Sequence, residues 1–427
     1  MKLFNEKWQL TLCLAGLASL AYGLPGLAAE PLTTPANLHA ATELAWKLHP
    51  QAAALDARDA QVRAAQDLAA SLTPEPGSLS MSSRNDRLNQ NGGQQEYEVE
   101  LATPLWLPGQ KSARQAEAAA QSDEALARRA ALRWEVAGEV REAWWSLAAA
   151  RNASALALRR LDSASALQRD VGRRHQVGEL SRIDANLALT EVHTAQAELI
   201  EAETAQAQAE QAFRMLTGAA APSGMSEERL SEQRNLPGLI DALTHGQSDA
   251  ALAHPLLAKA ASAMTSARAR AKVAEQSQRA APELALRMMR ERAAGDQPYA
   301  NSVGVRLKIP FSSGAQVRQQ NAAAAAEAMQ AEAELFQTNT RIQLNLEQLL
   351  RQQPALERQV AIAGQSQQLS AENLTLAEKA FKLGEFDLAA LLRIRAAALN
   401  ADSFLARQRL ARATLISRLN QALGVVP

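Results

Sequence analysis

Side chains that commonly perform catalysis or bind metals are sparse in this sequence and poorly spaced for either task. The one cysteine is Cys13, and the two histidines in the central helix-forming region, His175 and His193, lie too far apart to suggest a ligand pair. The spacings His-Glu-x-x-His, Gly-x-Ser-x-Gly and Gly-x-Gly-x-x-Gly, typical of zinc proteases, serine hydrolases and dinucleotide-binding folds, are absent. We therefore predict no catalytic residue, no metal site and no cofactor.

Charged residues with a regular spacing occur instead in two short segments. Glu98 and Glu100 alternate with apolar residues in the first segment, and Arg306 and Lys308 do so in the second. The alternating residues of the two rows are Tyr97, Val99, Leu101, Thr103 and Leu105, and Val303, Val305, Leu307, Ile309 and Phe311. A period of two predicts strands with one charged and one apolar face. Because the two rows carry opposite charges, we expect cross-strand ion pairs on the wet face.

A weaker alternating segment precedes each of these rows, so the sequence predicts two hairpins of two strands. We expect the strands at about 78–84, 96–105, 283–290 and 299–311. Strands of about nine or ten residues can cross a bilayer when tilted, and opposed apolar and charged rows are typical of outer-membrane barrels. Two hairpins on a soluble sheet are the alternative. Since open edges are not tolerated in lipid, four strands would have to be completed by sister chains.

The predicted hairpins belong to the two halves of an internal repeat. Helix breakers recur in the same order and at a nearly constant spacing, which indicates a duplicated unit. The matching positions are His49 and His254, Pro104 and Pro310, Gly109 and Gly314, Gly178 and Gly384, and Gly218 and Gly424. We expect a first repeat over 30–220, an inter-repeat segment over 221–246 and a second repeat over 247–427.

Most of each repeat is expected to be helical. The segment 110–174 is rich in Ala, Leu, Gln, Glu and Arg, which favour helix, and corresponds to roughly 100 Å of it. A helix from Ser181 to about Leu216 follows the break at Gly178, and the second repeat predicts helices over 315–382 and 387–423, with a kink at Pro354. The predicted fold is mainly α with a small β part: two tandem repeats of a long antiparallel helical hairpin and two strands. A long soluble coiled coil is the alternative for the helices alone.

Residues 1–29 are typical of a secretory signal peptide. Lys2 and Lys7 precede a short apolar stretch, and small residues lead to Ala29, where we expect cleavage. A retained membrane anchor and lipid attachment at Cys13 are the alternatives. The mature chain would contain no cysteine, which excludes disulfides and thiolate metal sites. The balance of 45 basic and 45 acidic residues gives no indication of a nucleic-acid partner.

In these motifs the chain resembles the TolC-type outer-membrane efflux proteins, and among them the heavy-metal efflux outer components similar to CzcC and CusC. The resemblance covers essentially the whole mature chain. It rests on four doubled motifs: the His-Pro pairs at 49–50 and 254–255, the strand exits 101–111 and 307–314, the helix breaks 174–184 and 381–387, and the closing segments 215–218 and 422–424. It implies a homotrimer in outer-membrane lipid, with a 12-stranded barrel continued by a periplasmic helical tunnel.

The resemblance also implies that both helix breaks lie at the periplasmic tip. A membrane-fusion adaptor is expected to contact Val177, Gly178, Glu179, Leu180, Leu383, Gly384, Glu385 and Phe386 there. Tip closure is expected from Asp184, Asp387 and Arg393. The second repeat has Ala390 at the position that corresponds to Asp184, so an acidic ring drawn from both repeats is not present. The barrel lumen is expected to be lined by Glu98, Glu100, Arg306 and Lys308.

These expectations describe a passive export duct rather than an enzyme. It would work with the adaptor and a resistance-nodulation-division (RND) pump of the inner membrane, and would export metal cations or small toxic compounds. The outer channel of a type I protein secretion or drug-export system is a second hypothesis. A soluble periplasmic coiled-coil scaffold is a third, and membrane fractionation separates it from the other two.

Overall fold

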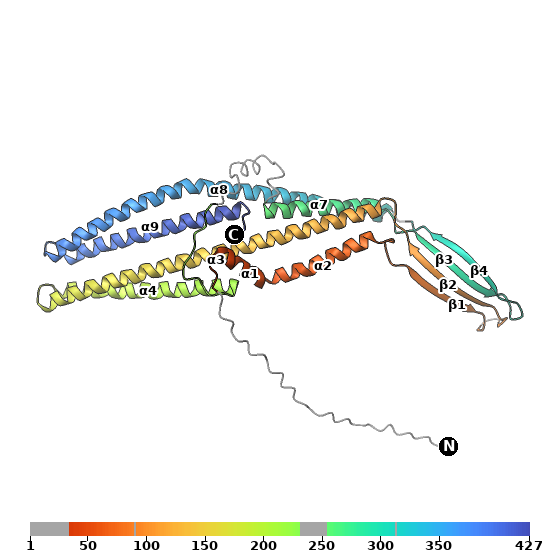
Figure 1. The fold of residues 1–427 in the computed structure, drawn as a ribbon, viewed down its shortest axis with the longest axis horizontal. Helices are drawn as coiled ribbons and strands as arrows, with labels where there is room; N and C mark the ends of the chain where they lie inside the picture. Colours follow the sequence, from red (N-terminus) through yellow and green to blue (C-terminus); the bar gives the residue numbers. More distant parts are fainter. Residues whose placement is uncertain (1–33, 89–90, 231–253, 312–313) are drawn as a thin grey trace, which may run out of the picture. The chain divides into compact units, whose positions relative to one another are not determined.

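The computed structural model describes residues 34–88, 91–230, 254–311 and 314–427. The signal peptide expected over 1–29 and most of the expected inter-repeat segment lie outside these ranges. All elements belong to one compact unit, Thr34–Pro427. In chain order they are α1 (Leu38–Leu48), α2 (Pro50–Ala70), β1 (Ser78–Asn85), β2 (Gln95–Pro104), α3 (Gln110–Gln176), α4 (Arg182–Thr217), α7 (Pro255–Gln276), β3 (Glu283–Arg292), β4 (Ala300–Lys308), α8 (Gly314–Lys382) and α9 (Leu388–Ala422) (Figure 1).

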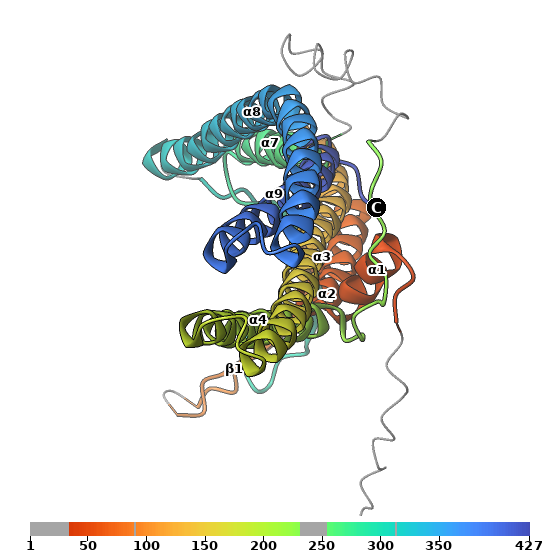
Figure 2. The same ribbon diagram turned by 90° about the vertical axis from the view of Figure 1, so that its left-hand side faces the viewer.

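The order of a helix, two strands and a long helical hairpin occurs twice. This confirms the expected fold class, mainly α with a small β part and two tandem repeats. The two long helices, α3 and α8, contain 67 and 69 residues, or about 100 Å each at ~1.5 Å per residue. Helix α8 continues through Pro354, and Figures 1 and 2 show it following a curved path.

The same backbone motif closes both hairpin turns. After α3, Gly178 adopts φ +85°, and the N–H groups of Gly178 and Glu179 donate to the carbonyls of His175 and Arg174 at 3.0 and 2.9 Å. After α8, Gly384 adopts φ +79°, and the corresponding bonds measure 3.2 and 3.0 Å. These bonds satisfy the last helical carbonyls, and the positive φ favours glycine.

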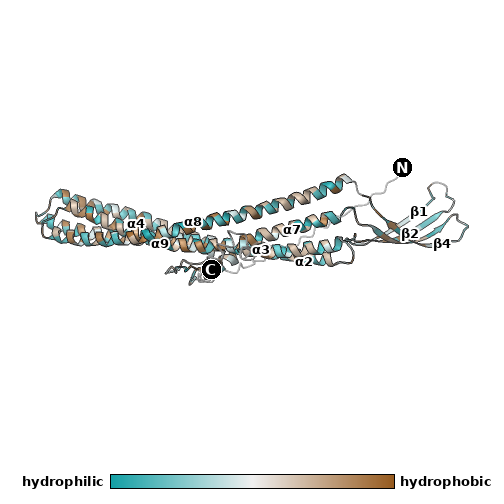
Figure 3. Cartoon of the chain, turned by 90° about the horizontal axis from the view of Figure 1, so that it is seen from above, coloured by the Kyte–Doolittle hydropathy of each residue, from teal (hydrophilic) through white to brown (hydrophobic). Residues whose placement is uncertain are grey.

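The long helices pack side by side along much of their length. Helix α3 contacts α2, α4, α7 and α9, and α8 contacts α7 and α9. Figure 2 shows the α3–α4 and α8–α9 hairpins in an end view. Hydrophobic and hydrophilic residues are interspersed along these helices (Figure 3). Many of the buried residues of α3 and α8 are alanines, which allow close approach of helices over a long distance.

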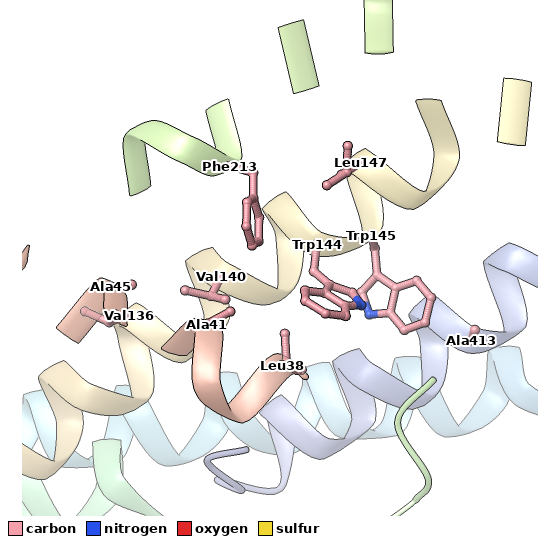
Figure 4. Packing of buried hydrophobic residues seen from close by; sticks show 10 residues of the cluster. All are labelled: Leu38, Ala41, Ala45, Val136, Val140, Trp144, Trp145, Leu147, Phe213 and Ala413. Atoms are coloured by element: carbon pink, nitrogen blue, oxygen red, sulfur yellow. The ribbon is translucent and has the colours of Figure 1, made fainter. Parts of the chain in front are cut away.

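An aromatic core lies where α1 and the end of α4 meet the middle of α3. Trp144 and Phe213 are fully buried, with ring centroids 6.1 Å apart. The cluster consists of Leu38, Ala41, Ala45, Val136, Val140, Trp144, Trp145, Leu147, Phe213 and Ala413 (Figure 4). Because truncating a buried large aromatic residue costs about 3–5 kcal/mol, this cluster fixes the position of α1 and α4 on α3.

A buried ion pair joins the two repeats through the segment that follows α4. The side chain of Arg141 on α3 is 4% exposed and lies 2.9 Å from the carboxylate of Glu228. Arg141 also donates to the carbonyl of Val425, beyond α9, at 3.0 Å, and Asn420 of α9 donates to the carbonyl of Arg229 at 2.9 Å. The several donors of one guanidinium thus link Glu228, in the described start of the inter-repeat segment, to the end of the second repeat.

The four strands form one antiparallel sheet in the order β1-β2-β3-β4. The central pair, β2 and β3, joins the two repeats, with Val99 opposite Met288. The two turns of the sheet touch at their glycines, where the N–H of Gly295 donates to the carbonyl of Gly92 at 3.0 Å. Strands β1 and β4 are the two edges, and the described part of the chain offers neither of them a second partner strand.

Candidate functional site

The sheet separates charged from apolar side chains. Successive side chains of a strand point to opposite faces, and the register places Glu98, Glu100, Arg287 and Arg306 on one face. The apolar face consists of Leu79 and Met81 of β1; Tyr97, Val99 and Leu101 of β2; Leu284, Leu286 and Met288 of β3; and Val303, Val305 and Leu307 of β4. Each face thus runs across both repeats.

The charged face is neutralised by ion pairs across the strands. Glu98 lies 2.7 Å from Arg287 and 3.6 Å from Arg306, and Glu100 lies 2.9 Å from Arg306. Arg306 reaches these carboxylates across β3 because the residue opposite it is the small Ala285. Lys308 pairs with Glu283 at 3.2 Å rather than with Glu98 or Glu100. The role of these residues in lining a lumen stays a prediction.

The apolar face of the sheet is exposed, whereas the two glutamates of the charged face are largely covered by their arginine partners. Met81 and Val305 on the apolar face are 73% and 74% exposed, whereas the side chains of Glu98 and Glu100 are only 17% and 14% exposed. Soluble sheets place their apolar face on a core, and a contiguous exposed apolar patch marks a surface that contacts another molecule or a membrane. This sheet needs an apolar environment outside the chain.

The two helical tips carry the residues expected to contact an adaptor. Val177 and Leu383 are 72% and 75% exposed at the turns, and a side chain added at Gly178 or Gly384 would meet no atom within 4 Å. Leu180 and Phe386 turn inward against an apolar tip cluster drawn from all four helices. The buried members of that cluster are Leu167, Val171, Ala188, Ala377, Phe381, Leu388 and Leu391. Each tip therefore consists of an exposed glycine turn that lies next to the buried apolar cluster.

The residues expected to close the tip have local roles in this chain. The carboxylate of Asp184 accepts hydrogen bonds from the Ser181 N–H at 3.1 Å and from the Ser181 hydroxyl at 2.7 Å, and the Ser181 hydroxyl caps α4 in return. Asp387 caps α9 by accepting the Ala390 N–H. Arg393 is exposed. Both carboxylates thus satisfy unpaired donors at a helix start, a role not predicted from the sequence, and their part in closure stays a prediction.

Side chains that the sequence did not single out connect the two tips. The guanidinium of Arg174 on α3 lies over the ring of Phe381 on α8 and donates to its carbonyl at 3.3 Å. Arg395 on α9 pairs with Glu378 of α8 at 2.7 Å and donates to the Ser163 carbonyl of α3 at 3.1 Å. The only sequence signal for these links was Arg174 in the helix-break motif.

Three further features of the described ranges bear on function: potential metal ligands, the hydropathy of the helices and groups with a shifted pKa. No three potential metal ligands come together there, and none of the helices is long and apolar enough to cross a membrane. Hydrogen bonds that Arg129 donates to the carboxylates of Asp56 and Asp59 raise the pKa of its guanidinium. The Gln206 amide and Arg151 lower the pKa of Glu210. Both groups lie on the helices, away from the sheet and the tips.

Comparison with known proteins places the chain among channel folds. Residues 38–219 match a family described as outer membrane efflux protein; no curated protein matches the chain. In structure the chain is similar to the CmeC outer membrane channel of Campylobacter jejuni, with 16% identity, a TM-score of 0.71, and coverage of 91% of this chain and 86% of that one. The VceC outer membrane protein of Vibrio cholerae is 17% identical, with a TM-score of 0.70 and coverage of 91% of this chain and 96% of that one. CusC is 15% identical, with a TM-score of 0.73 and coverage of 91% of this chain and 92% of that one. The identity to CusC is no higher than to the other two, so membership of the heavy-metal group stays a prediction.

Proposed function

We infer that this chain, of which residues 38–219 match the outer membrane efflux protein family, is one subunit of an outer-membrane efflux channel. The observation that carries this inference is the sheet, whose exposed apolar face opposes a face of paired charges. In a bilayer the apolar residues would be removed from water, which stabilises by roughly 25 cal/mol per Å². The charged face would then line a water-filled lumen, with Glu98, Glu100, Arg306 and Lys308 toward the pore.

The free edges of the sheet support a trimer. Backbone N–H and C=O groups cannot remain unpaired in hydrocarbon, so β4 of one chain must meet β1 of the next. Such a head-to-tail contact generates a ring when the rotation between neighbouring chains closes. Three chains, the number implied by the resemblance to the TolC-type proteins, would supply a barrel of 12 strands, with the helical hairpins extending the conduit into the periplasm.

The tips complete the proposed export path. Glycine turns with exposed Val177 and Leu383 lie at the end of the helical hairpins away from the sheet (Figure 1). A periplasmic adaptor would dock there and link the duct to an inner-membrane RND pump. The channel itself would be passive and would conduct metal cations or small toxic compounds. Any charge at the tip appears three times around a narrow pore, which multiplies its field.

Two lysine substitutions on neighbouring residues of β4 test membrane insertion. Val303 lies on the apolar face and Ser302 on the charged face, and both are exposed in the single chain. A lysine on the lipid face costs about 2–4 kcal/mol near the bilayer midplane. We expect Val303→Lys to reduce the amount of protein in the outer-membrane fraction strongly, and Ser302→Lys to leave it nearly unchanged.

The readout is the distribution of each variant between membrane and soluble periplasmic fractions, followed by conductance in planar bilayers. Recovery of the unsubstituted protein entirely in the soluble fraction would overturn the proposal and favour a periplasmic scaffold. Equal loss of both variants would show that the two faces of the sheet do not have different environments.

A further inference from the structure

The six cations in the strands fall into two groups. On the charged face Arg84, Arg287, Arg306 and Lys308 are each paired with a carboxylate. The other two, Arg290 and Arg292, lie on the apolar face, beyond Leu284, Leu286 and Met288 of the same strand. Within the described ranges, no carboxylate pairs with either of them. Two neighbouring positive charges are therefore left without a counter-ion beside an exposed apolar surface.

These two arginines are held by a tyrosine rather than by an acid. The guanidinium carbons of Arg290 and Arg292 lie 4.5 and 5.0 Å from the centroid of the Tyr299 ring. The Tyr299 hydroxyl donates to the side-chain oxygen of Gln95 at 2.5 Å, which fixes the ring. Stacking on an aromatic ring orients a guanidinium and leaves its edge donors available.

Their position in the sheet indicates which ligand they could bind. The apolar rows end here, at the turn end of the strands, and polar residues follow on the same face: Asn85 on β1, Gln95 on β2 and Asn301 on β4. Tyrosine and arginine are typical of the boundary between hydrocarbon and headgroups. A guanidinium binds phosphate through two parallel hydrogen bonds. An acyl chain on the apolar row would bring its own headgroup to this point.

We propose that Arg290, Arg292 and Tyr299 form a binding site for the phosphate group of an anionic membrane lipid. This rests on the proposed function, since the apolar face must lie in lipid. The lipid phosphate supplies the counter-ion that the described ranges do not provide, and the acyl chains cover the neighbouring Met288 and Tyr97, which are 58% and 47% exposed. Arg292 also donates to the carbonyl of Gly93 at 3.0 Å and so stabilises the turn. Within the described residues, the side chain of Arg290 interacts with Tyr299 alone.

The test measures lipid binding to the detergent-purified full-length protein by native mass spectrometry. The probes are a short-chain phosphatidic acid, the diacylglycerol with the same chains, and inorganic phosphate. The variants are Arg290→Gln, Arg290→Lys, and Arg84→Gln as a matched control near the turn end of the charged face. We expect the unsubstituted protein to bind phosphatidic acid more tightly than diacylglycerol, with Arg290→Gln weakening this binding roughly five- to tenfold, on the scale expected for one arginine at a membrane surface.

Arg290→Lys should recover much of the affinity, because the charge is retained, and Arg84→Gln should change it little. Equal binding of phosphatidic acid and diacylglycerol, or an equal loss in Arg290→Gln and Arg84→Gln, would overturn the proposal. Inorganic phosphate that competes fully at the same concentration would show a free-anion site instead and would also overturn it. Failure of the proposed function would be visible separately, because the unsubstituted protein would then remain in solution without detergent.

Discussion

Arg174 on α3 joins the two helical tips by binding both the ring and the backbone of Phe381 on α8. Its guanidinium carbon lies 4.9 Å from the ring centroid, and one nitrogen lies 3.3 Å from the Phe381 carbonyl oxygen. The same carbonyl accepts the N–H of Gly384 in the turn after α8, at 3.2 Å. Glu179 holds the guanidinium from the other turn at 3.0 Å. One side chain thus connects the backbone turns of both hairpins.

Replacing Arg174 with glutamine should loosen this link and favour separation of the tips. A cation–π contact and a hydrogen bond from a charged donor contribute about 1–2 kcal/mol together at a partly exposed site, which corresponds to roughly a tenfold shift between closed and open tips. We expect a higher open probability in planar bilayers. Arg173→Gln is the control, since among the described residues Arg173 pairs with Asp170 of its own helix alone. Identical single-channel records for the two variants would show that the link does not restrain the tips.

The elements of the fold could be predicted from the sequence because their signals are local. The period-two rows around Glu98 and Arg306 predicted strands with two different faces, and the breaks at Gly178 and Gly384 predicted the turns of the hairpins. Strand order depends on contacts between segments far apart in the chain. Arg306 and Lys308 were predicted to face Glu98 and Glu100, but β3 lies between them, which adds Arg287 to the network and gives Lys308 the partner Glu283.

Long-range side-chain contacts were the part of the site that sequence alone could not show. The pairing of Arg141 with Glu228 and the stacking of Arg174 on Phe381 depend on how the hairpins pack, which no periodicity encodes. Asp184 and Asp387 were predicted as charges at the tip, but each sits in the first turn or at the cap of a return helix. A Ser-x-x-Asp pattern at 181–184 was the available signal for the first of these caps.

The carboxyl group of Glu210 should contribute to the folding stability at neutral pH and lose this contribution in acid. The Gln206 amide, followed by Arg151, lowers its pKa below the ordinary 4.5. A group with a lowered pKa in the folded state stabilises that state above its unfolded pKa, and the contribution is lost as pH falls through the folded value. We expect Glu210→Gln to lower the thermal midpoint at pH 7 by a small amount, because the pair is partly exposed and worth at most about 1 kcal/mol. The thermal midpoints of the variant and the unsubstituted protein, plotted against pH, should converge in strong acid.

Glu203→Gln, exposed on the same helix, is the control. A difference in thermal midpoint between Glu210→Gln and the unsubstituted protein that persists at low pH would contradict a stabilising role of the ionised Glu210 carboxylate.

Breaking the buried pair of Arg141 and Glu228 should destabilise the protein much more. Removing one partner of a buried ion pair leaves an uncompensated charge and costs about 3–5 kcal/mol. We expect Arg141→Met to lower the thermal midpoint sharply. Combining it with Glu228→Leu should recover part of the loss, because neither charge then remains buried alone. If the double variant were as unstable as the sum of the single ones, the two residues would not be energetically coupled.

The glycine turns at the tips have space for a side chain, but their backbone conformation disfavours any residue other than glycine. Gly178 and Gly384 have open space around them but positive φ angles of +85° and +79°, and a side chain in this region costs about 1–2 kcal/mol. We expect leucine at both positions to distort the turns and abolish export while leaving membrane insertion intact. Gly364→Leu, inside α8 with open space around it, is the matched control. Normal export by the Gly178→Leu/Gly384→Leu variant, measured as resistance of intact cells to exported compounds, would place adaptor docking elsewhere.

Charge reversal at Arg306 should change the ion selectivity of the pore. Arg306 lies 2.9 Å from Glu100 and 3.6 Å from Glu98, so it neutralises part of an acidic row on the face that we propose lines the lumen. Arg306→Glu would leave Glu100 without its arginine and add a second acid beside it in each chain of the proposed trimer, while Arg287 still pairs with Glu98. A ring of like charge in a narrow conduit acts strongly on passing ions. We expect the reversal potential in a salt gradient to shift toward cation selectivity, with the trimer intact on native gels. Exchanging the charges in Glu100→Arg/Arg306→Glu should return it toward the original value, because the pair is restored with opposite polarity. Loss of the trimer in Arg306→Glu would mean that this face is buried between chains. Unchanged selectivity would mean that it is turned away from the water-filled pore.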